Sequence, residues 1–351
     1  MNKFNLITLG FSCLLLFLNN SLAQPNDLSS YIAFLKKGDI WISDTSSQNQ
    51  KQITSDSGKV QDFQFSPLLK YLAYSRIISY VDEPGLWDDT GKVPQRAISS
   101  IVIMDLQTKK IVKEIMPVED TWIYISKWLP NNKLLYYSSS GFDVSGYYVY
   151  DIQSDIKREV EYDKARIINS SDYSDDGTLM VYVDDSALGK DYKENIHLFN
   201  IQTNTDKILV SKKNINDIKI SNDKNQVAFI EVTETDEKYF DNLWVYNIRK
   251  DSLGSLYRGP ASAKTGNENE ISWSFDDQYI GIFFPPQALI ITVGTTDNIQ
   301  RIKGADFTWI ENGKIIFSQG NNIYFYSLNT HKSNLLIEDA AEPFFLRKKS
   351  Y

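Results

Sequence analysis

The sequence predicts an all-β fold made of repeated four-stranded units, and three observations lead to this prediction. One phrase, a short strand followed by a tight turn and a second apolar strand, returns along the chain and first occurs at residues 63–74. Each copy is followed by an alternating strand that ends in Asp or Asn, as at residues 147–151. A polar turn and a short fourth strand complete the unit, as at residues 207–210. Alternation of apolar and polar residues is typical of half-buried strands.

Six copies of the phrase align on the residue that ends their first strand. These anchor residues are Phe65, Trp128, Tyr173, Ile220, Trp273 and Trp309. The sixth copy contains Asn312-Gly313, the strongest short signal for a β-hairpin. Units of roughly 40–50 residues with four short strands are typical of the blades of a β-propeller.

The two ends of the chain decide the number of blades. Residues 32–34, 40–44 and 52–54 supply strands two to four of a blade that lacks only its first strand. Residues 342–346 can supply that strand, which closes the ring and removes the exposed edges of an open sheet. The sequence therefore predicts a seven-bladed propeller as one domain, residues 24–351, with six blades as the alternative.

Residues 1–23 are predicted to be a secretory signal peptide. Lys3 precedes an almost wholly apolar run at residues 4–18, and a small-x-small cleavage site ends at Ala23. The only cysteine, Cys13, lies in this segment, so thiol chemistry is not expected after cleavage. No later run approaches the ~20 apolar residues of a membrane span. We therefore expect a periplasmic or secreted protein.

The repeat resembles that of the TolB-like β-propeller family, whose phrase is an aromatic residue, Ser-Pro-Asp-Gly-Lys and then Ile-Ala-Phe. The best matches are Phe65-Ser66-Pro67 with Tyr71-Leu72-Ala73-Tyr74, and Tyr173-Ser174-Asp175-Asp176-Gly177. The copies that contain Pro130 and Phe275 depart from the pattern. Similar repeats occur in the propeller domains of prolyl-oligopeptidase-type peptidases and in certain polysaccharide lyases. The resemblance thus implies a propeller architecture and leaves the activity open.

The longest connections are predicted between the second and third strands of the units, on one face of the ring. They cover residues 76–99, 138–146, 184–194 and 231–241. Long loops on a rigid scaffold often carry binding residues. The candidates here are Tyr80, Trp87, Asp88, Asp89, Arg96, Tyr192, Tyr239 and Phe240. In the alternative interpretation, Trp87 and Tyr80 fold back and cover the blade beneath them.

The position three residues before the anchor is acidic in five of the seven units. These residues are Asp62, Asp217, Glu270, Asp306 and Glu342. Because this position begins the innermost strand, we expect the carboxylates to surround the mouth of a central channel. Repulsion between them favours a cation, either a divalent ion such as calcium or a basic group of a partner. Alternatively, each acid caps its own loop or pairs with a local base such as Arg166.

Motifs for catalysis are sparse. The chain has two histidines, His197 inside an alternating strand and His331 in a polar turn, and it has no Gly-x-Ser-x-Gly motif. A lone histidine in a strand is more often packed than catalytic. The several metal-binding histidines that a resemblance to the lyases implies have no counterpart here. A mechanism based only on carboxylates stays open, since two acids suffice for glycoside hydrolysis.

Two functions from different classes follow. The first is an exported, non-catalytic scaffold that binds a protein, a peptide or an envelope component through the long-loop face and the acidic channel mouth. The alternative is a carbohydrate-active enzyme, a glycosidase or lyase that uses the same carboxylates. The net charge of −8, from 45 acidic and 37 basic residues, argues against nucleic acid or an anionic membrane as the main partner.

Overall fold

The structure is a computed structural model that describes residues 30–82, 93–118, 121–139, 145–159, 168–184, 193–235, 238–260, 270–284, 287–295 and 298–347. Within these ranges the chain forms 28 strands and one short 3-10 helix, η1 (Pro130–Asn132). No helix in these ranges is long and apolar enough to cross a membrane. The predicted signal peptide, residues 1–23, lies outside the described residues.

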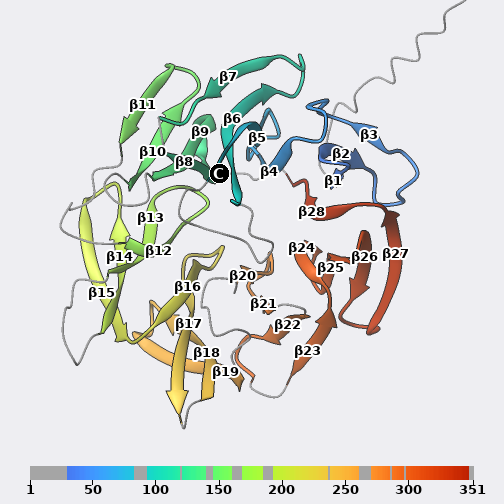
Figure 1. Cartoon of the computed structure of the whole chain (residues 1–351). Helices are drawn as coiled ribbons and strands as arrows, with labels where there is room; N and C mark the ends of the chain where they lie inside the picture. Colours follow the sequence, from blue (N-terminus) through green and yellow to red (C-terminus); the bar gives the residue numbers. More distant parts are fainter. Residues whose placement is uncertain are drawn as a thin grey trace, which may run out of the picture.

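The strands form seven antiparallel sheets of four strands each, arranged as blades around a ring (Figure 1). From its inner to its outer strand, blade 1 consists of β28 (Ala341–Phe345), β1 (Ile32–Lys36), β2 (Asp39–Ser43) and β3 (Lys51–Gln52). Blade 2 consists of β4 (Val60–Phe65), β5 (Tyr71–Asp82), β6 (Gln95–Asp105) and β7 (Ile111–Ile115). Blade 3 consists of β8 (Trp122–Leu129), β9 (Lys133–Ser139), β10 (Ser145–Asp151) and β11 (Ile156–Glu159).

The remaining four blades follow in chain order. Blade 4 consists of β12 (Ile168–Tyr173), β13 (Leu179–Asp184), β14 (Glu194–Asn200) and β15 (Thr205–Lys212). Blade 5 consists of β16 (Ile215–Ile220), β17 (Gln226–Thr235), β18 (Lys238–Asn247) and β19 (Ser252–Pro260). Blade 6 consists of β20 (Glu270–Trp273), β21 (Tyr279–Phe284), β22 (Gln287–Thr292) and β23 (Ile299–Lys303). Blade 7 consists of β24 (Ala305–Glu311), β25 (Lys314–Gln319), β26 (Asn322–Ser327) and β27 (Lys332–Glu338).

The C-terminal strand closes the ring, as the sequence predicts. β28 pairs with β1, with Phe345 opposite Ile32 and Phe344 opposite Ala33. The backbone N–H of Leu346 also donates to the carbonyl oxygen of Tyr31 at 2.8 Å. The prediction of seven blades is therefore confirmed, and the alternative of six is wrong.

The turn between the first two strands recurs in several blades, and a serine stabilises it. In four blades a buried serine hydroxyl accepts a hydrogen bond from the backbone N–H five residues later, at 2.9–3.0 Å; the serines are Ser66, Ser174, Ser221 and Ser274. Where the turn requires positive φ, Gly177 adopts +65°. In blade 3, which has Leu129 in place of the serine, the turn is instead the helix η1.

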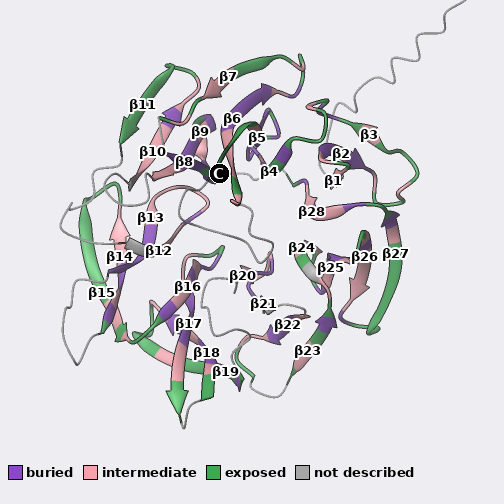
Figure 2. Cartoon of the chain, viewed as in Figure 1, coloured by how far each residue is buried: buried purple, intermediate pink, exposed green. Residues whose placement is uncertain are grey.

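The core lies between neighbouring blades. One cluster joins Tyr71 and Ile103 of blade 2 to Trp128 and Tyr136 of blade 3, and Trp128 is 4% exposed. Figure 2 shows that exposure is greatest on the outermost strands, such as β15 and β27. The anchor residues thus act as apolar wedges that fix the blades, and with them the first strands, around the centre of the ring.

The structure corrects two of the predicted loops. The described parts of residues 76–99 and 231–241 are mostly strand, because β5 with β6 and the ends of β17 and β18 continue as paired ribbons past the other strands of their sheets. The ribbon of blade 2 runs from the pair Ile77–Ser99 to the pair Asp82–Gln95. The described part of the extra length is therefore paired strand where loops were expected; residues 83–92 and 236–237 lie outside the described residues. The other two predicted loops, 138–146 and 184–194, fall mostly outside the described residues.

Candidate functional site

The five predicted acidic residues lie where the inner strands begin. Glu270 is the first residue of β20, and the other four lie at or beside a shift of register in their strands; they are Asp62, Asp217, Asp306 and Glu342. Asp306 and Glu342 also adopt positive φ, 35° and 51°. A β-bulge adds one residue to a strand and changes the direction of its side chain. Repeated bulges therefore set these carboxylates apart from the regular pairing of the blades.

The five acids come from consecutive blades. In ring order they are Asp217 on blade 5, Glu270 on blade 6, Asp306 on blade 7, Glu342 on blade 1 and Asp62 on blade 2. Blade 1 lies between blades 7 and 2 because the ring closes there (Figure 1). The same position holds Ile125 on blade 3 and Ser170 on blade 4. We call the five carboxylates the acidic arc.

Burial, with smaller contributions from charges on neighbouring blades, raises the pKa of acids in the arc. Burial raises the pKa of Glu342 to about 7, and the charges of Asp306 and Asp62 add to the shift. Burial also raises the pKa of Asp62 on blade 2. The charge of Glu270 on blade 6, beyond blades 7 and 1, adds to this shift. Carboxylates that raise each other's pKa favour a positively charged occupant. Asp62, Glu270 and Asp306 are nevertheless exposed, so such an occupant has access to them.

Asp217 has a structural contact in addition to its place in the arc. Its carboxylate accepts hydrogen bonds from the backbone N–H of Ile271, at 2.7 Å, and from that of Ile218, at 2.8 Å. Burial raises its pKa to about 6, although Lys219 and these hydrogen bonds oppose the shift. Asp217 therefore ties blade 5 to blade 6. The alternative partner Arg166 lies outside the described residues.

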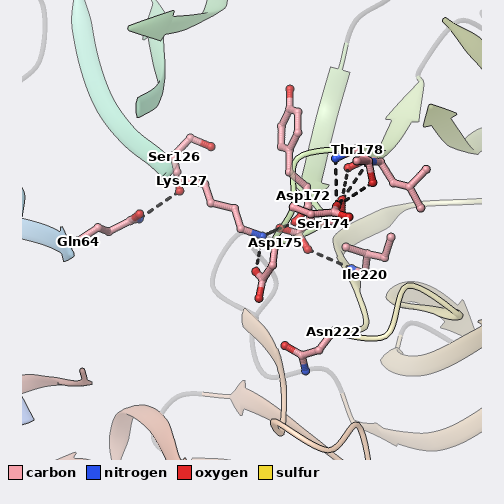
Figure 3. Close-up of polar contacts among 12 residues, drawn as sticks. Gln64, Ser126, Lys127, Asp172, Ser174, Asp175, Thr178, Ile220 and Asn222 are labelled. Carbon is pink, nitrogen blue, oxygen red and sulfur yellow. Dashed lines mark hydrogen bonds and ion pairs between the residues drawn. The ribbon is translucent and has the colours of Figure 1, made fainter. Parts of the chain in front are cut away.

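A second set of polar residues lies immediately before the anchors of blades 2 to 5, and three of them bind the next blade. Gln64 Nε2 donates to the carbonyl oxygen of Ser126 at 3.1 Å. Lys127 Nζ donates to the carbonyl oxygen of Tyr173. The backbone N–H of Ile220 donates to Asp172 Oδ2 at 3.0 Å. Figure 3 shows these contacts as they pass from blade to blade. They hold the inner strands at fixed positions.

Lys219, at the same position in blade 5, is different. Its carbonyl oxygen accepts a hydrogen bond from Trp273 Nε1 at 3.3 Å, whereas its ammonium makes no hydrogen bond or ion pair with the described part of the chain. Desolvation opposes its charge, but the carboxylates of Asp217, Asp172 and Glu270 raise its pKa above the ordinary value for lysine. The sequence analysis did not find this residue. The signal that was available is the repeat itself, since the position before the anchor is polar in six consecutive blades, blades 2 to 7.

The predicted aromatic residues lie on the two ribbons. Tyr80 on β5 is 58% exposed, and Tyr239 on β18 is 40% exposed. The guanidinium of Arg96 lies 4.4 Å from the ring centroid of Trp122 on blade 3, and Arg258 lies 4.9 Å from that of Phe240. The other four candidates fall outside the described residues; they are Trp87, Asp88, Asp89 and Tyr192.

His197 has the environment of a packed residue. It is 3% exposed, its Nδ1 lies 2.9 Å from Asp206 Oδ2, and its ring stacks on Tyr182 with centroids 4.6 Å apart. Across the described ranges, no three His, Cys, Asp or Glu side chains converge closely enough to hold a metal ion. The divalent cation at the acidic arc stays a prediction.

Comparisons with known proteins show a shared fold. No protein-family model and no curated protein matches the chain. Among solved structures, a prolyl endopeptidase is 10% identical with a TM-score of 0.53; the match covers 89% of this chain and 50% of the endopeptidase, so the chain spans half of that enzyme's length. TolB from Acinetobacter baumannii is 15% identical with a TM-score of 0.48, over 91% of this chain and 67% of TolB.

A third structure, the β-propeller domain of Cps50 (Swd1) from Myceliophteria thermophila, is 11% identical with a TM-score of 0.48, over 89% of this chain and 98% of that domain. At these identities a likeness shows the fold and assigns no activity. The predicted relation to the prolyl-peptidase propellers is confirmed as a shared fold.

Proposed function

We propose that the chain is an exported, non-catalytic binding scaffold that holds a basic segment of a partner protein at the acidic arc. One observation carries the proposal: the arc and the two ribbons share a face of the ring. Asp62 pairs with Ser75, just before the ribbon of blade 2 begins at Ile77. Asp217 pairs with Ile230, just before the ribbon of blade 5.

The chemistry of this face suits a basic chain segment. Lysine and arginine side chains make charge-assisted hydrogen bonds to carboxylates, and their charge offsets both the burial and the repulsion by Asp306 and Asp62 that raise the pKa of Glu342. The exposed rings of Tyr80 and Tyr239 stand on ribbons at the same face and offer apolar contact beside the charges. Aromatic residues are common anchors in protein interfaces. Export is supported by the signal-peptide pattern that ends at Ala23.

The test is a comparison of two variants with equal change of charge. The arc variant carries Asp62→Asn, Glu270→Gln, Asp306→Asn and Glu342→Gln, and it keeps Asp217 for its structural contact. The control variant neutralises four exposed acids in or next to turns at the opposite ends of the strands, namely Asp155, Asp223, Asp251 and Glu311. Fluorescence anisotropy with labelled Lys- and Arg-rich peptides should show at least a tenfold weaker affinity for the arc variant only. Equal affinities of the two variants would refute the proposal.

The native partner is tested separately. A pull-down from the native cell envelope should recover a protein that is lost when residues 77–98, the ribbon of blade 2, are deleted. Mass spectrometry of the mature chain should give an N-terminus at Gln24. A partner that binds the deleted form unchanged argues against a role of this ribbon.

The carbohydrate-active enzyme stays a second candidate because Tyr80 is 58% exposed on the same face as the carboxylates. A glycan-degradation screen decides it. Loss of activity in Asp217→Asn or Glu270→Gln would support the enzyme, whereas no activity in the wild type would remove it.

A further inference from the structure

Exposed large apolar side chains gather above blades 2 and 3, on the face of the ring that carries the acidic arc. Single exposed apolar residues are normal on a protein surface, whereas a contiguous group marks an interaction site. The six members of this group have exposed fractions from 36% to 64%; they are Ile78, Tyr80, Val81, Met116, Val118 and Tyr124. We call them the apolar patch.

A contact between blades 2 and 3 brings these side chains together. Arg96, on the ribbon of blade 2, has its guanidinium 4.4 Å from the ring centroid of Trp122, the first residue of β8. Val81 is paired with Arg96 across the ribbon. Tyr124 lies two residues after Trp122 and therefore on the same side of β8. Strands β5 and β6 both contact β8, and the two neighbouring blades meet here (Figure 1).

Met116 and Val118 belong to the connection from blade 2 to blade 3. This connection starts where β7 ends, at Ile115, on the ribbon side of its sheet. The backbone N–H of Thr121 donates to the carbonyl oxygen of Val118 at 3.0 Å, which forms a turn directly before Trp122. The patch therefore comes from three segments, namely the ribbon, this connection and the start of β8.

The apolar patch begins where the acidic arc ends. Asp62 is the member of the arc on blade 2, and the same position on blade 3 holds Ile125, which is 7% exposed. Tyr124, directly before Ile125, is 54% exposed. A ligand that follows the inner edge of this face from blade 5 round to blade 3 therefore meets carboxylates first and apolar side chains next.

The charge of the arc decides between three kinds of occupant for the patch. A second copy of the chain that docked by the same face would bring two acidic arcs together, and their charges would repel each other. An anionic lipid surface would meet the same repulsion. A chain segment with basic residues beside its apolar residues is complementary to both surfaces.

We propose that the apolar patch binds a short aliphatic or aromatic run that adjoins the basic run of the partner segment. This inference rests on the proposed function and specifies its ligand. The basic side chains bind the acidic arc, and the apolar side chains leave water on the patch. The guanidinium of Arg96, at the patch, repels lysine and arginine, and this repulsion sets the order of the two runs across the face.

The experiment compares two peptides that share one lysine- and arginine-rich run. In the first peptide the run adjoins three leucines, and in the second it adjoins three serines. Isothermal titration calorimetry with the wild type should show at least tenfold tighter binding of the leucine peptide, because burial of one leucine side chain suffices for that factor.

Two variants with matched substitutions locate the effect. The patch variant carries Tyr80→Ser, Met116→Ser, Val118→Ser and Tyr124→Ser, and it should bind the two peptides with equal affinity. The control variant carries Leu68→Ser, Ile111→Ser, Ile208→Ser and Leu335→Ser, at sites that are 49–56% exposed away from this patch, and it should keep the preference for leucine. Loss of the preference in both variants, or in neither, overturns the inference.

Other outcomes separate this inference from the proposed function. Equal binding of the two peptides to the wild type overturns the role of the patch and leaves the acidic arc as a site for basic segments; this comparison does not depend on whether a variant folds. No binding of either peptide overturns both. Sedimentation velocity and co-flotation with phosphatidylcholine vesicles test the other occupants. A dimer, or vesicle binding, that is lost in the patch variant and kept in the control assigns the patch to a second copy or to lipid and overturns the inference.

Discussion

The indole Nε1 of Trp128 donates to the carbonyl oxygen of Gln64 at 3.0 Å, and this hydrogen bond ties blade 3 to the inner strand of blade 2. Trp309 occupies the same position in blade 7 and is 2% exposed, but its Nε1 has no partner within the described ranges. The two anchors thus share a packing role and differ in one hydrogen bond.

This difference predicts unequal costs for the same substitution. Trp128→Phe removes the hydrogen bond to the carbonyl of Gln64, whereas Trp309→Phe removes a buried N–H that has no partner among the described residues. Trp128→Phe should therefore lower the free energy of unfolding by about 1–3 kcal/mol more than Trp309→Phe does. Urea unfolding followed by circular dichroism measures both. Equal losses would mean that packing alone decides the role of the anchors.

The closed ring of seven blades could be predicted from the sequence because the repeat is local. Each anchor, turn and alternating strand recurs at short range, and the unit at residues 32–54 lacks only the strand that residues 342–346 provide. The acidic position could be predicted for the same reason, since it is counted from the anchor.

The ribbons, and the side-chain contacts of β16 with the next blade, could not be predicted in this way. Pro84 and Gly85 suggest a loop within residues 76–99, yet pairing of Ser79 with Ile98 and of Tyr80 with Ala97 extends the strands on either side of them. Which side chain of β16 contacts the next blade depends on the packing between blades 5 and 6. Because Asp217 makes that contact, the result is fixed by packing between blades and has no local signal.

The acidic arc predicts a pH-dependent effect of Glu342→Gln. The pKa of Glu342 is raised from an ordinary 4.5 to about 7, so the folded chain holds this proton more firmly than the unfolded chain. The free energy of unfolding therefore falls as the pH rises from about 4.5 to 7, because the unfolded chain loses this proton at lower pH than the folded chain does. Below about pH 4.5 the carboxyl is protonated in both states and has no such effect. Glu342→Gln should therefore raise the melting temperature at pH 8 and leave it unchanged at pH 4.

Differential scanning fluorimetry across this range is the measurement for Glu342→Gln. Glu338→Gln, at an exposed position of β27, is the control and should show no such trend. A gap between Glu342→Gln and the wild type that does not vary with pH would show that the folded chain does not raise the pKa of Glu342.

Asp217 and Glu270 should respond differently to truncation although both belong to the arc. Asp217→Ala leaves the buried backbone N–H of Ile271 without its acceptor and should lower the free energy of unfolding by about 1–3 kcal/mol. Glu270 is exposed and repels its neighbours, so Glu270→Ala should cost less than about 0.5 kcal/mol or stabilise the fold. Denaturant titration distinguishes them; a larger loss for Glu270→Ala contradicts the assignment of the tie to Asp217.

Ring closure depends on the packing of Phe344 as well as on the pairing of β28 with β1. The ring of Phe344 stacks on Phe65 with centroids 6.2 Å apart and meets Phe63 edge-on at 6.2 Å, so it joins blade 1 to blade 2. Phe344→Ala should lower the free energy of unfolding by about 3 kcal/mol, since the removed ring leaves a cavity between two blades. Leu335→Ala, at a site that is 49% exposed on β27, should change it by less than about 0.5 kcal/mol.

Hydrogen exchange locates the effect of Phe344→Ala. If β28 is the element that closes the ring, amides of β1 and β28 should exchange faster in this variant, because those two strands pair only with each other and with β2. Amides of blade 4, on the far side of the ring, should keep their protection unless the whole chain unfolds. Uniform acceleration over all seven blades would instead mean that the propeller unfolds as one unit, with no local opening at the closure of the chain's two ends.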